Sequence, residues 1–154
     1  EAAGASVYVL RHPDHYPHHL PSAKYRAQES DRLAQFLDHV DVAVSLHGYG
    51  RVGRSTQLLA GGRNRVLAEH LAHNVVVPGY QVVTDLDAIP RELRGLHPDN
   101  PCNRTRGGGI QLELPPRVRG LTPLALHWPG TGRRFSHTQH LIEGLVRAAQ
   151  TWAV

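Results

Sequence analysis

The sequence predicts an α/β protein built on a mixed, mainly parallel β-sheet with helices on both faces. Short runs of β-branched and other apolar residues alternate along the chain with segments that repeat apolar residues every three or four positions. Strands that alternate with helices form βαβ units, in which the connecting helices cover the sheet. The chain of 154 residues contains no internal repeat or low-complexity tract, so residues 1–154 are predicted to form one domain.

The first predicted strand is residues 6–10, SVYVL, because Val and Tyr favour extended backbone. A loop rich in Pro and His follows and leads to a predicted helix over residues 31–40. Ser30 is placed to cap the start of this helix. The apolar face of the helix consists of Leu33, Phe36, Leu37 and Val40.

The later elements alternate in the same way. The further predicted strands are residues 42–46, 57–62, 80–84 and 110–114. The further predicted helices are residues 63–74 and 136–153. In the first of these, Asn74 is the expected C-cap. Its expected inward side chains are Val66, Leu67 and Leu71. A long loop over residues 87–109 precedes the last strand and is predicted to contain one helical turn. It is longer than compact domains usually contain without a functional reason.

The composition limits the classes of partner and compartment. The formal net charge is +4 at pH 7, and arginine supplies nearly all of the positive charge, because Lys24 is the only lysine. A basic surface attracts anionic partners, although a GC-rich genome would also produce an arginine-rich chain. No block of basic residues suggests a nucleic-acid-binding tail, and no apolar run reaches the roughly 18 residues of a membrane span. Cys102 is the single cysteine, which excludes an internal disulfide and favours a cytoplasmic location over secretion.

His47 is the first candidate functional residue. It ends the predicted strand 42–46 and is followed by Gly48. In open α/β sheets, ligands bind outside the carboxyl ends of the strands. A histidine held there can serve as a metal ligand or as a base, or it can simply begin a turn.

Glu113 and Gln111 are the second candidates. They lie two positions apart on the predicted strand 110–114, so both side chains point to one face of the sheet. The opposite face takes Ile110, Leu112 and Leu114. A carboxylate on such an apolar strand is costly unless it is paired or used. Glu113 is therefore a candidate general base or metal ligand, with a solvated position on an edge strand as the alternative.

Other residues carry weaker signals. Asn103 and Arg104 could bind an anion, since a guanidinium holds a carboxylate with two hydrogen bonds, or they could belong to an ordinary basic loop. The three glycines at 107–109 come directly before a predicted strand. A phosphate-binding loop comes before a helix, so this kind of site is excluded. Cys102 is predicted to be structural, and Ser45 and Ser55 lack a nucleophile-elbow motif. The segment before the first predicted helix contains four histidines that could be further metal ligands or could simply be solvated loop residues. They are His12, His15, His18 and His19.

The segments SLHG, AGGRN, GYQV, NPCNR and GGGIQLELPPRVR, in this order and at these separations, resemble the poly-γ-glutamate hydrolases. HHLPS at 18–22 also resembles a segment of that family. These enzymes are also known as phage replication-related proteins and are related to zinc carboxypeptidases. The likeness covers about residues 5–119.

The resemblance implies a zinc carboxypeptidase-like fold that lacks its first strand and helix. It implies that His47 is one zinc ligand and that Glu113 is the general base. It places Asn103 and Arg104 beside the substrate carboxylate or the developing oxyanion, so Arg104 is a second predicted catalytic residue. Gln111, on the same strand face as Glu113, is predicted to bind substrate with them. The family's other two ligands belong to an early HGG…E segment, which this sequence does not contain. The sequence also begins without Met, so residue 1 is expected not to be the native start. A separate chain carrying the missing segment is one expected partner.

The implied activity is zinc-dependent hydrolysis of amide bonds in γ-linked polyglutamate or a related acidic peptide. One alternative is a catalytically incomplete relative that binds an acidic polymer. A second alternative is an α/β nucleic-acid-binding module, which is disfavoured because the chain lacks a basic helix and has only 6% aromatic residues.

Overall fold

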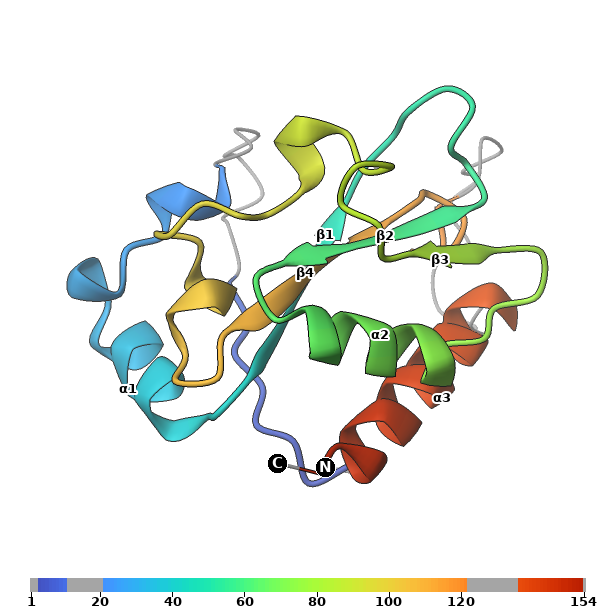
Figure 1. The fold of residues 1–154 in the computed structure, drawn as a ribbon. Coiled ribbons are helices and arrows are strands. Elements are labelled where there is room, and N and C mark those ends of the chain that lie inside the picture. Colours follow the sequence, from blue (N-terminus) through green and yellow to red (C-terminus); the bar gives the residue numbers. More distant parts are fainter. Residues whose placement is uncertain (1–2, 11–20, 122–135, 154) are drawn as a thin grey trace.

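The computed structural model describes residues 3–10, 21–121 and 136–153 (Figure 1). The strands are β1 (Ala43–Gly48), β2 (Gln57–Gly62), β3 (Gln81–Val83) and β4 (Gly109–Leu114). The α-helices are α1 (Asp31–His39), α2 (Arg65–Asn74) and α3 (Ser136–Thr151). The short 3₁₀ turns are η1 (Ser22–Lys24), η2 (Ala27–Glu29), η3 (Arg91–Leu93) and η4 (Pro101–Arg104).

The strands form one mixed sheet with the order β1-β4-β2-β3. β4 runs parallel to β1 and antiparallel to β2, and β2 runs parallel to β3. The predicted mixed, mainly parallel sheet is therefore confirmed. The register of β1 and β4 places Ser45 opposite Gln111 and His47 opposite Glu113, so these four side chains share one face of the sheet.

The main hydrophobic core lies on the opposite face, where α2 and α3 pack (Figure 1). Its strand residues include Leu58, Ala60, Ile110, Leu112 and Leu114. As the alternation of β4 predicts, the apolar side chains of that strand point into this core and its two polar side chains point away.

The face that carries Gln111 and Glu113 is covered by the loop between β3 and β4. Ile89 of this loop is buried against Leu59 and Val83 of the sheet. The loop is held by backbone contacts, because the Arg94 carbonyl accepts a hydrogen bond of 2.7 Å from the Gly62 amide. A Cβ at Gly61 would lie 2.2 Å from the same oxygen, so only glycine allows this close approach. This loop contains two 3₁₀ turns, η3 and η4, where the sequence predicted one helical turn.

The predicted strand 6–10 is wrong. Ser6–Leu10 contribute no strand, and their described contacts are with α1, where Ser6 Oγ lies 3.0 Å from His39 Nε2. The Tyr8 ring packs on Phe36 with centroids 5.7 Å apart. A strand needs a neighbouring strand for its backbone hydrogen bonds, and a cavity separates this segment from β1. The β propensity of Val and Tyr therefore did not suffice to make this segment a strand of the sheet.

The helix predictions are confirmed, with corrections at single positions. Ser30 Oγ accepts a hydrogen bond of 3.3 Å from the Leu33 amide at the start of α1. In α2, Val66 is 73% exposed instead of inward, and the buried residues are Leu67, Ala68 and Leu71. Asn74 is the last helical residue rather than the C-cap. In the part of the chain that the structure describes, no helix has the length and apolar character to cross a membrane.

Candidate functional site

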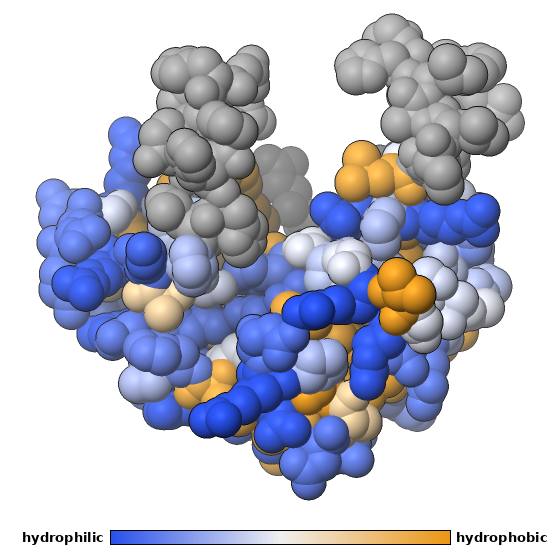
Figure 2. Space-filling model, turned by 90° about the horizontal axis from the view of Figure 1, so that it is seen from above, coloured by the Kyte–Doolittle hydropathy of each residue, from blue (hydrophilic) through white to orange (hydrophobic). Residues whose placement is uncertain are grey.

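A cavity of about 470 Å³ lies at the carboxyl ends of β1 and β4. Its wall combines these strand ends with η1, η3 and the loop that follows η3. The polar side chains that line it are Ser22, His47, Arg91, Glu92, His97, Asn100, Gln111 and Glu113. On this side of the molecule, opposite α2 and α3, most of the surface is hydrophilic (Figure 2). The predicted residues His47, Gln111 and Glu113 thus meet at one cavity.

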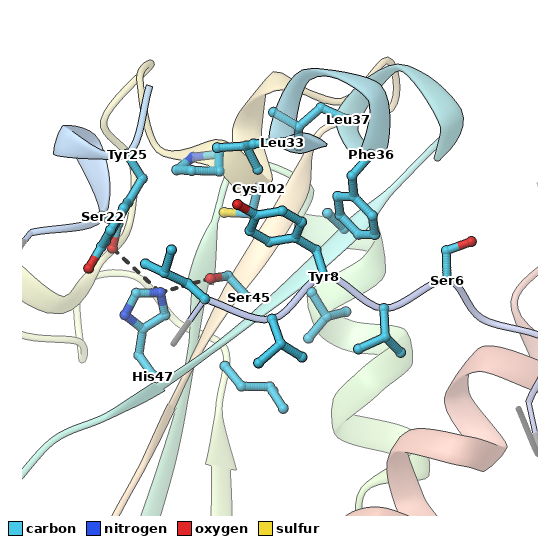
Figure 3. A pocket seen from close by; sticks show the side chains of 17 residues that line it. Ser6, Tyr8, Ser22, Tyr25, Leu33, Phe36, Leu37, Ser45, His47 and Cys102 are labelled. Atoms are coloured by element: carbon cyan, nitrogen blue, oxygen red, sulfur yellow. Dashed lines mark hydrogen bonds between the residues drawn. The ribbon is translucent and has the colours of Figure 1, made fainter. Parts of the chain in front are cut away.

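His47 is held at the strand end by two hydroxyl groups. Its Nε2 lies 2.7 Å from Ser45 Oγ and 3.4 Å from Ser22 Oγ (Figure 3). Ser45 points to the same face of β1 because it lies two residues earlier. Ser22 comes from η1, which lies 25 residues before His47 in the chain. The imidazole is therefore oriented rather than loosely exposed.

Glu113 is 3% exposed and Gln111 is 5% exposed. Since β4 lies between β1 and β2, the alternative of a solvated edge-strand carboxylate does not hold. Gln111 Nε2 donates a hydrogen bond of 2.7 Å to Glu113 Oε1. Asn100 Nδ2 in turn donates one of 2.7 Å to Gln111 Oε1. The buried carboxylate is thus fixed by an amide that is itself held in place.

Tyr49, next to the strand end, has a structural role. Its hydroxyl oxygen lies 2.7 Å from the carbonyl oxygens of both Arg54 and Gln57, which share its single proton. Burial raises the pKa of Tyr49 to about 12, with the carboxylate of Glu113 acting in the same direction and Arg54 opposing it. The phenol therefore stays protonated at neutral pH and braces the turn between β1 and β2.

Asn103 and Arg104 do not line this cavity. Asn103 Nδ2 donates hydrogen bonds of 2.7 Å and 3.0 Å to the carbonyls of Gly95 and His97, which holds the wall of the cavity. The Arg104 guanidinium lies 3.3 Å from the carboxylate of Asp99. Direct contact of Asn103 and Arg104 with a substrate stays a prediction.

The structure adds residues to the site that the sequence did not single out. Asn100 and Ser22 contact Gln111, and Ser45 contacts His47. Arg91 adds a cation to the cavity wall. Two signals were available in the sequence: Ser22 ends the segment HHLPS, and the spacing of Ser45 from His47 places both on one strand face.

A second cavity of about 570 Å³ lies between Ser6–Leu10, α1 and β1 (Figure 3). Its lining is mostly apolar, with Tyr8, Leu33 and Phe36 among the contributors. Both cavities share Ser22 and His47. His47 therefore stands at the boundary between a polar cavity and an apolar one.

Cys102 also lines the apolar cavity and is 1% exposed. Its Sγ donates to Asn100 Oδ1 at 3.3 Å. Burial raises the pKa of the thiol to about 12, so the reactive thiolate is scarce at neutral pH. These properties agree with the structural role predicted for Cys102.

The donor set for a metal is incomplete among the described residues. His47 is the one predicted ligand, and Glu113 is the nearest carboxylate in the register of the sheet. Within residues 3–10, 21–121 and 136–153, no group of three or more His, Cys, Asp or Glu side chains could hold a metal ion. A catalytic zinc takes three protein ligands, so these residues do not complete a zinc site by themselves. The histidine cluster His12, His15, His18 and His19 lies outside the described residues.

Comparison with known proteins gives one family and two related structures. Residues 1–122 match the family model for poly-gamma-glutamate hydrolase. No match was found among curated proteins. The structure of YNDL in a zinc-free apo form is similar, with a TM-score of 0.65, 20% identity, and coverage of 86% of this chain and 63% of that chain.

The structure of a bacteriophage poly-gamma-glutamate hydrolase is also similar, with a TM-score of 0.56, 21% identity, and coverage of 86% of this chain and 59% of that chain. The chain therefore spans less than two thirds of the length of either structure. At this identity the two likenesses bear on the fold alone, and they agree with the α/β fold predicted from the sequence.

Proposed function

Because the chain belongs to the poly-gamma-glutamate hydrolase family, we propose that it hydrolyses amide bonds in γ-linked polyglutamate or a related acidic peptide. The observation that carries this proposal is the pairing of His47 and Glu113 on neighbouring strands at a polar cavity. A histidine and a buried carboxylate at the carboxyl ends of strands are the groups that amide hydrolysis uses.

Glu113 is the proton carrier in this proposal. Its carboxylate takes a proton from the attacking water and transfers it to the leaving amine. Gln111 Nε2, at 2.7 Å, fixes the orientation of the carboxylate. Asn100 prevents Gln111 from turning, since its amide donates to the Gln111 oxygen at 2.7 Å.

We propose zinc as the cofactor and His47 as one of its ligands. Zinc held there would lower the pKa of a coordinated water to about 7 and would supply a Lewis acid for the substrate carbonyl. The support is the position of His47 at a strand end and the likeness to YNDL, whose zinc-free apo form has been solved. Since the described residues do not complete the ligand set, a separate chain with further ligands stays a candidate partner.

The substrate proposed here carries one free carboxylate on each residue, so binding requires cations. Arg91 lines the cavity, is exposed, and has no ion pair with any residue that the structure describes. Asn103 and Arg104 are the residues predicted from the sequence for this task, together with Gln111 of the cavity wall. Arg104 is ion-paired with Asp99 and would have to exchange that partner for the substrate.

The proposed function is tested with γ-linked and α-linked polyglutamate of equal length, in the presence of zinc. We expect the γ-linked polymer to become shorter and the α-linked polymer to stay intact, as measured by size-exclusion chromatography. Binding of the γ-linked polymer without cleavage would support the catalytically incomplete relative instead. Absence of both binding and cleavage would contradict the proposal.

Arg104→Lys is expected to reduce cleavage of the γ-linked polymer severalfold. The change keeps the positive charge but removes the two-pronged hydrogen bonding of a guanidinium to a carboxylate. The measurement is kcat/KM, with Arg106→Lys as the control, because Arg106 is an exposed arginine of the same loop that pairs with Asp41. Activity of Arg104→Lys within about twofold of the parent would show that Arg104 is an ordinary surface residue, as expected for exposed ion pairs.

A further inference from the structure

The side chains around His47 form a connected series of hydrogen bonds that ends at Glu113. We propose that this series fixes the His47 ring as the tautomer with its proton on Nε2. Nδ1 is then the nitrogen that carries the lone pair. Ser22 and Gln111 are positioning residues in this arrangement, because they act on the tautomer of His47 through the hydrogen bonds of Ser22. The proposal concerns the metal-free protein and holds whether His47 serves as a ligand or as a base.

The orientation of the Gln111 amide is set by its neighbours Glu113 and Asn100. A carboxylate can only accept hydrogen bonds, so the Gln111 group that lies 2.7 Å from Glu113 Oε1 must be the amide nitrogen. The amide oxygen of Gln111 therefore points the other way, toward Asn100 and Ser22. Asn100 Nδ2 lies 2.7 Å from this oxygen and 3.3 Å from the Gly95 carbonyl oxygen. Both oxygens can only accept hydrogen bonds, so the Asn100 group between them is the amide nitrogen. Two independent neighbours thus give the same orientation.

The hydroxyl of Ser22 is the next step. Ser22 Oγ lies 3.3 Å from Gln111 Oε1, which can only accept, so a hydrogen bond between these two groups uses the single proton of Ser22. Toward His47 Nε2, at 3.4 Å, Ser22 can then present only a lone pair. With the Ser22 proton used in the bond to Gln111, the ring nitrogen is the donor to Ser22. Ser45 Oγ, 2.7 Å from the same nitrogen, accepts from it as well (Figure 3).

The hydrogen bonds of Nε2 therefore determine which of the two ring nitrogens of His47 carries the proton. A neutral imidazole with its proton on Nε2 keeps its lone pair on Nδ1. Without the fixed lone pair of Ser22, the Ser45 hydroxyl could rotate and donate to Nε2, which would stabilise the other tautomer. Ser22 therefore decides the direction of the short hydrogen bond between Ser45 and His47.

The test is a long-range ¹H–¹⁵N correlation spectrum of the histidine rings in metal-free protein, at a pH of about 8 where an ordinary histidine is neutral. The His47 signals are identified by their loss in His47→Gln. In the parent protein we expect a protonated nitrogen at Nε2 and an unprotonated one at Nδ1. In Ser22→Ala and in Gln111→Met, the two ¹⁵N frequencies are expected to move toward each other, as in a mixture of tautomers.

Ser22→Thr keeps the hydroxyl and is expected to keep the parent pattern. Ser55→Ala, at an exposed serine between β1 and β2, is the matched control. Circular dichroism and thermal unfolding show whether each variant is folded. Should Gln111→Met not fold, Ser22→Ala decides alone, because Ser22 belongs to a short turn outside the sheet. A proton on Nδ1 in the parent, or an unchanged pattern in folded Ser22→Ala, would overturn the proposal.

Discussion

Glu113→Gln is expected to reduce turnover of γ-linked polyglutamate by about a hundredfold or more, the usual scale of general acid–base catalysis. Glutamine keeps the volume of the side chain, and its amide oxygen can still accept the hydrogen bond from Gln111 Nε2. The strand and the cavity should therefore stay intact while the proton acceptor is lost. The measurements are kcat on the γ-linked polymer, zinc content and thermal unfolding.

Glu92→Gln is the control for this change. Glu92 lines the same cavity, but its side chain is 55% exposed and paired with Arg51, so turnover should stay within about twofold of the parent. Loss of zinc together with activity in Glu113→Gln would identify Glu113 as a metal ligand instead of a base. Unchanged turnover would remove Glu113 from the mechanism.

His47→Ala is expected to abolish cleavage and to remove zinc from the protein that cleaves the polymer. Loss of a hydrogen-bond partner of a metal-bound histidine already costs about 10- to 100-fold in affinity, so loss of the ligand itself should cost more. His47 is half-buried at a strand end and lies outside both hydrophobic cores, so the unfolding temperature should change little. Zinc content by elemental analysis and kcat on the γ-linked polymer are the two measurements.

His73→Ala provides the comparison for His47→Ala. His73 is an exposed histidine near the end of α2, so its removal should change neither zinc content nor turnover. Retention of stoichiometric zinc by His47→Ala would show that other side chains hold the metal. The assignment of His47 as a ligand would then be wrong.

The sequence by itself determined most of the regular elements and one face of the site. Ser30 followed by an apolar repeat located α1, and the alternation along β4 separated Gln111 and Glu113 from the core residues of the same strand. These features depend on the geometry of one strand or one helix, so neighbouring residues encode them. For the same reason, the motif around His47 could be placed at a strand end before the sheet was known.

Only the tertiary structure decided which elements pair and which side chains meet. Residues 6–10 have the composition of a strand, yet they lie across a cavity from β1 and form none. The antiparallel placement of β2 beside β4 is likewise not encoded in either strand alone.

Ser22 and Gln111 stand 89 residues apart in the chain and become neighbours only through the fold. Strand partners and the direction of each hydrogen bond depend on contacts between distant segments. Local propensity and periodicity describe one segment at a time and therefore leave both undetermined.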